Sequence, residues 1–152
     1  KFPMPTDEDV ALEDFLLPSN DRRLEDLVIS RSDLRLNREL PSERQNRPLR
    51  VGEVGKGGQG ERVYSCKGHA ITLSAFGGGI GAKTGLYWID GKVRRLHPEE
   101  CSQIMGFSKE FQLSSRRNVS YKQFGNSVAI PVVSKIFESI QRSLCLQSLE
   151  AA

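Results

Sequence analysis

The chain has 152 residues, 38% of them hydrophobic, and a formal net charge of +3 at pH 7. That length allows one modest core, and no apolar run approaches membrane-spanning length, so we expect no membrane partner and a cytoplasmic location. Two histidines and three widely spaced cysteines argue against a metal site and favour three reduced thiols. The sequence begins with lysine, which is compatible with a true N-terminus further upstream.

The charge is unevenly distributed along the chain. Residues 1–30 carry eight acidic against three basic residues, whereas residues 31–122 carry seventeen basic against nine acidic residues. A basic stretch that surrounds polar loops indicates a polyanionic partner, although a merely soluble surface is the simpler alternative.

The first third of the chain has few strong structural signals. We expect residues 1–20 to form an extended acidic segment, in which Val10 to Leu17 can form one or two helical turns before Pro18. Leu24 to Leu36 alternates apolar and charged residues at roughly strand spacing. Residues 39–48 are polar and contain prolines, which is typical of a linker.

Residues 49–95 predict short strands separated by glycine-rich loops. Twelve of the fourteen glycines lie from Gly52 to Gly91, and nine of these fall in two tracts, one over residues 55–65 and another over residues 70–85. The side chains between these glycines are of the types that hydrogen-bond phosphates and base edges, namely Lys56, Gln59, Arg62, Thr72 and Ser74. Two flexible surface loops are the alternative interpretation.

The second tract resembles two phosphate-binding motifs but lacks their context. Residues 77–82 approach a dinucleotide fingerprint, and residues 77–84 approach a P-loop. Both motifs need a strand before the loop, which residues 70–76 can supply, and a helix after it. Residues 85–89 are instead of β type, and Asp90-Gly91 predicts a two-residue hairpin turn, so we reject both motifs.

Helices are expected after Leu96. Pro98 in the first turn, the following glutamates and Gly106 predict a helix from His97 to Met105, and Ser108 can cap another. A turn over residues 120–124 precedes an amphipathic helix whose apolar residues recur at three- and four-residue steps from Ala129 to Leu144. We expect this apolar stripe to face a sheet that the chain does not itself supply.

Three blocks carry a resemblance to a known family. They are residues 55–85, residues 90–107 (which begin Asp-Gly-Lys-Val-Arg-Arg-Leu-His-Pro-Glu-Glu) and residues 121–128 (Tyr-Lys-Gln-Phe-Gly-Asn-Ser-Val). In this order they resemble the C-terminal part of bacterial DNA (cytosine-5)-methyltransferases, the last two resembling the ninth and tenth conserved motifs. Residues 1–89 resemble the target-recognition domain of the branch that methylates GCGC.

The resemblance implies an α+β fold. A small, irregular, β-rich target-recognition domain (1–89) would precede helices (90–152) that complete an α/β S-adenosylmethionine-dependent methyltransferase domain. The family's catalytic Pro-Cys dipeptide and its other early motifs are absent from the sequence, so we expect no catalytic residue and no metal here. We expect a heterodimer with a chain that carries the first eight motifs, acting on double-stranded DNA in a restriction–modification system.

The resemblance also assigns roles to individual residues. Gln59 would enter the duplex and pair with the guanine orphaned by base flipping, and Arg62 would read guanine. The implied DNA-binding set is Lys56, Gln59, Arg62, Thr72, Ser74, Phe76, Gly77, Gly78 and Gly79, with Phe76 standing where close relatives carry tyrosine. Gly125, Asn126 and Ser127 would approach S-adenosylmethionine, with Gly125 letting the chain turn into the final helix. Arg94 and Arg95 would brace the recognition domain against the catalytic domain.

Other interpretations stay open at this level. The Gly125–Ser127 triplet alone also fits a helix N-cap, and Arg94 and Arg95 also fit a solvated strand end. The whole chain also fits a sequence-specific DNA-binding module without catalysis, or a degenerate remnant without function.

Overall fold

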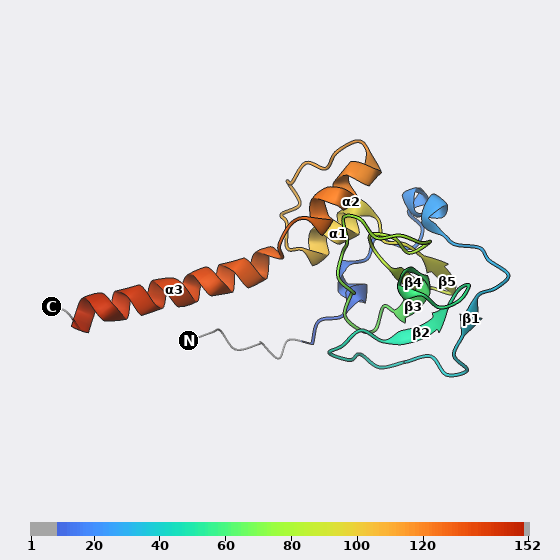
Figure 1. Ribbon diagram of the computed structural model, residues 1–152, viewed down its shortest axis with the longest axis horizontal. Helices are drawn as coiled ribbons and strands as arrows, with labels where there is room; N and C mark the ends of the chain where they lie inside the picture. Colours follow the sequence, from blue (N-terminus) through green and yellow to red (C-terminus); the bar gives the residue numbers. More distant parts are fainter. Residues whose placement is uncertain (1–8, 151–152) are drawn as a thin grey trace.

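A computed structural model of the chain describes residues 9–150, with side chains as far as residue 145. A five-stranded sheet forms the body, helices α1 and α2 pack beside it, and α3 extends away from it (Figure 1). This arrangement confirms the α+β class. In chain order the elements, with η for a 3-10 helix, are η1 Leu12–Phe15, η2 Arg22–Leu27, β1 Arg35–Leu36, β2 Arg50–Glu53, η3 Gln59–Glu61, β3 Arg62–Ser65, β4 Leu86–Ile89, β5 Lys92–Arg94, α1 Pro98–Ile104, α2 Arg117–Gly125 and α3 Ile130–Glu150.

The sheet has one parallel pair among antiparallel ones. Its strands lie in sequence order, and β3 pairs parallel with β4, Val63 facing Leu86. A parallel pair needs a crossover connection, which here is the segment 66–85 and contains no helix. Because β3 and β4 begin at the same edge of the sheet, the residues just before each strand become neighbours. Those residues belong to the two glycine tracts.

The two tracts make direct backbone contact. The amide of Gly81 donates to the carbonyl oxygen of Gly60 over 2.7 Å. A Cβ atom on Gly60 would overlap the carbonyl oxygen of Gly78, and one on Gly81 would lie 2.8 Å from the carbonyl oxygen of Gly60. Glycine is therefore required here because two backbones touch, not because the loops need to be flexible.

Strand β4 is covered on both faces. Its successive side chains point to opposite sides, so Leu86 joins one apolar cluster while Tyr87 and Ile89 join another. The first cluster contains Val51, Val54, Val63, Leu86 and Val93, and the second contains Leu12, Tyr87, Ile89, Leu96, Cys101, Tyr121 and Phe124. The second cluster attaches α1 and α2 to the sheet.

A buried carboxylate joins three segments of the chain. Glu100 accepts two hydrogen bonds from the Arg94 guanidinium, at 2.7 and 2.8 Å, and both side chains are buried. It also accepts from the backbone amides of His97, at 2.7 Å, and Leu17, at 2.9 Å. Strand β5, helix α1 and the segment after η1 therefore share one charge-assisted network.

Helix α1 begins as the sequence predicts. His97 is its N-cap, Pro98 lies in the first turn, and the imidazole Nδ1 accepts from the amide of Glu99 over 3.3 Å. Burial lowers the pKa of His97, which keeps the imidazole neutral and Nδ1 free to accept. The Asp90-Gly91 turn is also confirmed, with φ of 48° and 78°, and it joins β4 to β5 within one sheet.

Several expected elements differ from the structure. Residues 70–76 form no strand, because the parallel partner of β3 is β4 and the crossover runs outside the sheet. Residues 24–36 are not one strand: η2 occupies their start, and β1 has only two residues. Ser108 opens a turn closed by its bond to the amide of Phe111, not a helix. The turn expected at 120–124 is part of the longer helix α2.

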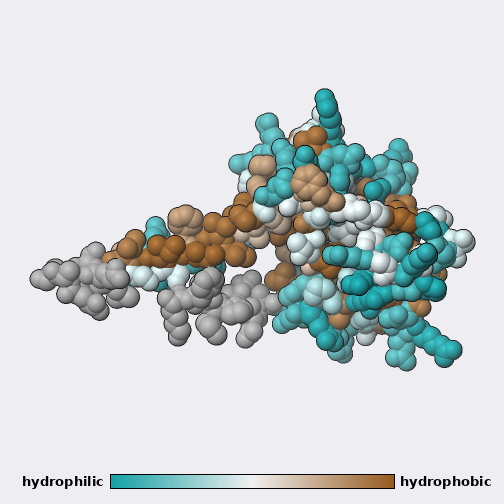
Figure 2. Space-filling view, viewed as in Figure 1, coloured by the Kyte–Doolittle hydropathy of each residue, from teal (hydrophilic) through white to brown (hydrophobic). Residues whose placement is uncertain are grey.

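Helix α3 confirms the amphipathic helix expected near the C-terminus. It leaves the body after Pro131 in its opening turn, and its large apolar side chains form a band along the projecting rod (Figures 1 and 2). The exposed ones are Ile130, Val132, Phe137, Ile140 and Leu144. Across residues 9–150, no helix combines the length and apolarity needed to cross a bilayer.

We predict that the substitution Glu100→Ala lowers the free energy of unfolding by about 3–5 kcal/mol, because it leaves the buried Arg94 charge without its partner. Glu99→Ala on the same helix is the control. Its carboxylate meets Arg23 at the surface, so the loss should be about 0–1 kcal/mol. Urea unfolding of the full chain measures both, and equal losses would contradict the proposed role of Glu100.

A second prediction concerns the contact between the glycine tracts. Gly60→Ala should destabilise the chain by about 1–3 kcal/mol, because a backbone oxygen occupies the space that the methyl group needs. Gly78→Ala, whose Cβ meets nothing within 4 Å, should leave the melting temperature nearly unchanged. Thermal unfolding of both variants decides the matter, and a Gly60→Ala protein as stable as the Gly78→Ala protein would refute the close packing of the two tracts.

Candidate nucleic-acid interface

The first glycine tract forms a tight, internally bonded loop between β2 and β3. The Glu61 carboxylate accepts from the amides of Gly58, at 2.9 Å, and Lys56, at 3.2 Å. A backbone hydrogen bond joins the two ends of the loop, because the amide of Val54 donates to the carbonyl of Glu61 over 2.8 Å. Lys56 and Gln59 remain exposed on this loop. The carboxylate thus orders the backbone while the hydrogen-bonding side chains face outward.

Arg62 follows this loop as the first residue of β3. Its Nε atom is buried and finds no acceptor among the described residues. A buried donor without a partner is costly, so this guanidinium is suited to an acceptor brought by a ligand. The N7 and O6 atoms of guanine are acceptors that an arginine fork matches.

The second glycine tract is closed at its base. The amide of Ser74 donates to the carbonyl of Lys83 over 2.9 Å, and Gly77 lies so close that its Cβ would stand 3.2 Å from the Lys83 nitrogen. Beyond this closure, Phe76 is 78% exposed. Gly78 and Gly79 are exposed at the point where the loop meets Gly60 of the first tract. The structure therefore brings the two tracts that hold the predicted DNA-binding residues into contact, while Thr72 is exposed before the closure.

Helix α2 supports the second tract with one face. Asn118, Lys122 and Gly125 are spaced four and three residues apart, so they lie on one side of the helix. The ammonium of Lys83 contacts Asn118 Oδ1 at 3.4 Å, and the ammonium of Lys122 lies 5.1 Å from the centre of the Phe76 ring. The second distance is that of a cation–π contact. Sequence reasoning missed Lys122 and Asn118, because their partners lie more than thirty residues away and only the fold brings them together.

Gly125 has a different structural role from the one expected. It is the last residue of α2, and a Cβ there would overlap the backbone of Ser74 and Ala75. It therefore lets the second tract pack against α2. The turn into α3 is made afterwards, by residues 126–129.

Asn126 and Ser127 lie at the C-terminal end of α2, so the N-cap interpretation of this triplet is wrong. The amide of Asn126 donates to the carbonyl oxygens of Lys122 and Gln123, both at 3.2 Å, and its side chain is exposed. The Ser127 hydroxyl donates to the carbonyl of Phe124 over 2.9 Å, which leaves its oxygen free to accept. An exposed carboxamide beside a hydroxyl oxygen offers hydrogen-bond donors and acceptors to a polar ligand.

The two motif arginines have separate environments. Arg94 is buried in the network with Glu100, so it is not a solvated strand end. Arg95 is half-buried, and its Nε finds no acceptor among the described residues.

The cysteines are free, and two of them lie in environments that disfavour the thiolate. Burial raises the pKa of Cys101 and of Cys66. Neither is therefore suited to act as a nucleophile.

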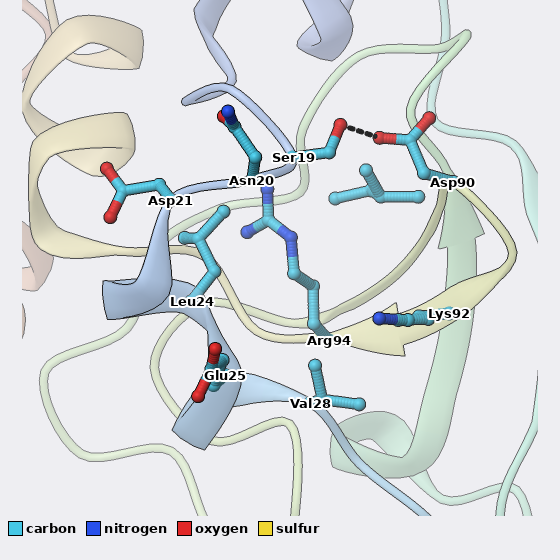
Figure 3. A pocket seen from close by; sticks show the side chains of 10 residues that line it. Ser19, Asn20, Asp21, Leu24, Glu25, Val28, Asp90, Lys92 and Arg94 are labelled. Atoms are coloured by element: carbon cyan, nitrogen blue, oxygen red, sulfur yellow. Dashed lines mark hydrogen bonds between the residues drawn. The ribbon is translucent and has the colours of Figure 1, made fainter.

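A surface concavity lies away from the glycine tracts. It has a volume of about 210 Å³ and is bounded by η2 and the β4–β5 hairpin (Figure 3). Ser19 Oγ donates to Asp90 over 2.5 Å at its edge, and the stem of Arg94 runs along it. Acidic and basic side chains are mixed here, and none of the residues predicted to bind DNA lines it.

The chain resembles known proteins along most of its length. Residues 8–142 match the family described as C-5 cytosine-specific DNA methylase. The chain is 47% identical over 144 residues to the Type II methyltransferase M.HhaI of Haemophilus parahaemolyticus, covering 95% of this chain and 43% of that protein. It is 46% identical over 63 residues to M.MspI of a Moraxella species, covering 40% of this chain and 15% of that protein.

Solved methyltransferase structures share the fold. The Dnmt2 methyltransferase of S. pombe gives a TM-score of 0.60 at 14% identity, covering 90% of this chain and 43% of that one. The Entamoeba histolytica methyltransferase EhMeth gives 0.62 at 18% identity, covering 95% and 44%. The chain thus spans less than half the length of these proteins. Its sequence and fold nevertheless agree along nearly its full length, and the chain belongs to the C-5 cytosine-specific DNA methylase family.

Proposed function

We propose that this chain is the DNA-recognition portion of a split DNA (cytosine-5)-methyltransferase. It reads a short GC-rich site, GCGC, and supports flipping of the target cytosine, while a partner chain carries the catalytic cysteine. The enzyme would act in the cytoplasm within a restriction–modification system. Residues 1–89 serve recognition in this proposal, and residues 90–152 serve attachment and cofactor contact.

The observation that carries the proposal is the meeting of the two glycine tracts. Gln59 is exposed and Arg62 has a buried unpaired donor, and both lie beside the contact of Gly60 with Gly78 and Gly81. A thin backbone ridge with hydrogen-bonding side chains fits a DNA groove, because glycines add no bulk between backbone and bases. Gln59 offers both a donor and an acceptor to an orphaned guanine, and Arg62 offers a fork to guanine N7 and O6.

The remaining residues of the interface have supporting roles. Lys56, Thr72 and Ser74 contact phosphate or base edges, and residues 76–79 form the edge of the second loop. Phe76 has no hydroxyl with which to hydrogen-bond DNA, and Lys122 already lies over its ring. We therefore assign Phe76 to the support of the loop.

The cofactor contact lies at the other end of α2. In the assembled enzyme S-adenosylmethionine supplies the methyl group, and it is the cofactor of this family. Asn126 and Ser127 hold one side of it, while Gly125 keeps this end of the helix against the second tract. The exposed stripe of α3 packs on the partner chain, which removes its apolar side chains from water.

Reconstitution tests the proposal. The purified chain is mixed with the portion of the Haemophilus parahaemolyticus relative that it does not match, and methyl transfer to a GCGC duplex is followed with labelled S-adenosylmethionine. We expect transfer only from the mixture. Methyl transfer by this chain alone would refute the split enzyme, and duplex binding without transfer in any mixture would favour the non-catalytic DNA-binding module.

Single substitutions in the reconstituted enzyme separate recognition from assembly. Arg62→Gln should lower kcat/KM on GCGC by about 10- to 100-fold, because it removes a bidentate guanine contact. Lys92→Gln, which changes the same charge on the exposed hairpin, should leave kcat/KM unchanged. Co-elution on size-exclusion chromatography should be unaffected in both.

A further inference from the structure

We propose that a groove at the start of α2 binds the sugar–phosphate backbone of DNA that flanks the recognition site. The inference rests on the proposed function, since it extends the DNA contact from the glycine tracts onto a surface to which the sequence analysis assigned no DNA contact. The groove has a volume of about 690 Å³. Its lining is Leu27, Arg95, Arg116, Arg117, Asn118 and Val119, with Tyr121 beside them.

The charge of the groove favours a polyanion. Three of its lining residues are arginines, and none of the described residues that line it carries a carboxylate. The planar guanidinium fork matches a phosphate group better than a lysine ammonium does. A groove with this lining therefore suits successive phosphates along a strand.

Arg95 supplies an independent sign of a missing acceptor. Its Nε atom is buried, and the part of the chain that the structure describes offers it no hydrogen-bond partner. Since buried donors are almost always paired in folded proteins, a shift of the Arg95 side chain toward an oxygen in the groove would complete its hydrogen bonding.

One acidic group competes for the same surface. Asp26, just before Leu27 of the lining, forms an ion pair with Arg117 and is itself exposed. A phosphate would have to share Arg117 with this carboxylate. The charge of Asp26 therefore opposes the phosphate binding that the arginines favour. Removing the Asp26 charge should tighten DNA binding, whereas removing an arginine charge should weaken it.

The position of the groove connects it to the recognition surface. Asn118 of the lining accepts from the ammonium of Lys83, which lies at the base of the second glycine tract. Lys122, one turn further along α2, lies over Phe76 of the same tract. Positive charge thus continues from the groove to the loop, so a strand leaving the loop can follow it. This continuity favours DNA over an acidic segment of the partner chain as the occupant.

The inference is tested by measuring duplex binding at several salt concentrations. The protein used is the full chain in complex with the catalytic portion. The probes are a long labelled duplex with a central GCGC and the same duplex trimmed close to that site. The slope of log K against log salt falls by about 0.9 for each phosphate that the protein no longer neutralises. The double variant Arg116→Gln, Arg117→Gln should therefore lower the slope by about 2 on the long duplex and leave the trimmed duplex nearly unaffected.

Two further variants complete the test. Asp26→Asn should tighten binding of the long duplex, because it frees Arg117. Arg142→Gln on α3 removes one positive charge outside the groove and should leave the slope unchanged.

An unchanged slope in the double variant would overturn the inference while the proposed function stood. The inference would also be overturned if the double variant failed to assemble with the catalytic portion while the isolated variant chain kept the salt slope of the unsubstituted chain. That result would assign the groove to a carboxylate of the partner chain. Failure of the unsubstituted protein to bind either duplex would instead overturn the proposed function itself.

Discussion

The parallel pairing of β3 with β4 is the constraint on which the proposed recognition surface depends. An antiparallel continuation of the sheet would have put the starts of these strands at opposite edges and separated the glycine tracts. The parallel register brings Gly60 and Gly81 within hydrogen-bond distance. The long helix-free crossover that such a pair requires contains the second glycine tract, which we propose as the second recognition loop. The parallel pairing thus accounts both for the second glycine tract and for its contact with the first.

The rest of the body holds this edge of the sheet in place. Glu100 ties β5, α1 and the segment after η1 into one buried network, and the apolar cluster around Tyr87 carries α2. Helix α2 then lies along the second tract, through the Lys122–Phe76 contact and the close packing of Gly125 on Ala75. The proposed cofactor residues Asn126 and Ser127 follow directly on this helix. In our account, the DNA end and the cofactor end of the chain therefore share a single rigid element.

Local signals in the sequence predicted the parts of the fold that depend on neighbouring residues. The short helix with Pro98 in its first turn, the Asp90-Gly91 turn and the amphipathic helix through Phe137 all follow from short-range chemistry, and the structure has them. The three motif blocks also led to the correct family. The prediction of a strand over residues 70–76 was wrong, because the apolar residues of this segment pack against the apolar cluster around Tyr87 from outside the sheet. The burial of Arg94, the close contact at Gly125 and the role of Lys122 depend on distant partners, so spacing alone could not have predicted them.

Hydrogen–deuterium exchange of the full chain, with and without a GCGC duplex, tests the central claim most directly. If both glycine tracts form one DNA-binding surface, the duplex should slow amide exchange in residues 55–62 and 74–83 together. A duplex of scrambled sequence should slow it less. Protection of one tract without the other, or protection confined to segments outside both, would contradict the account.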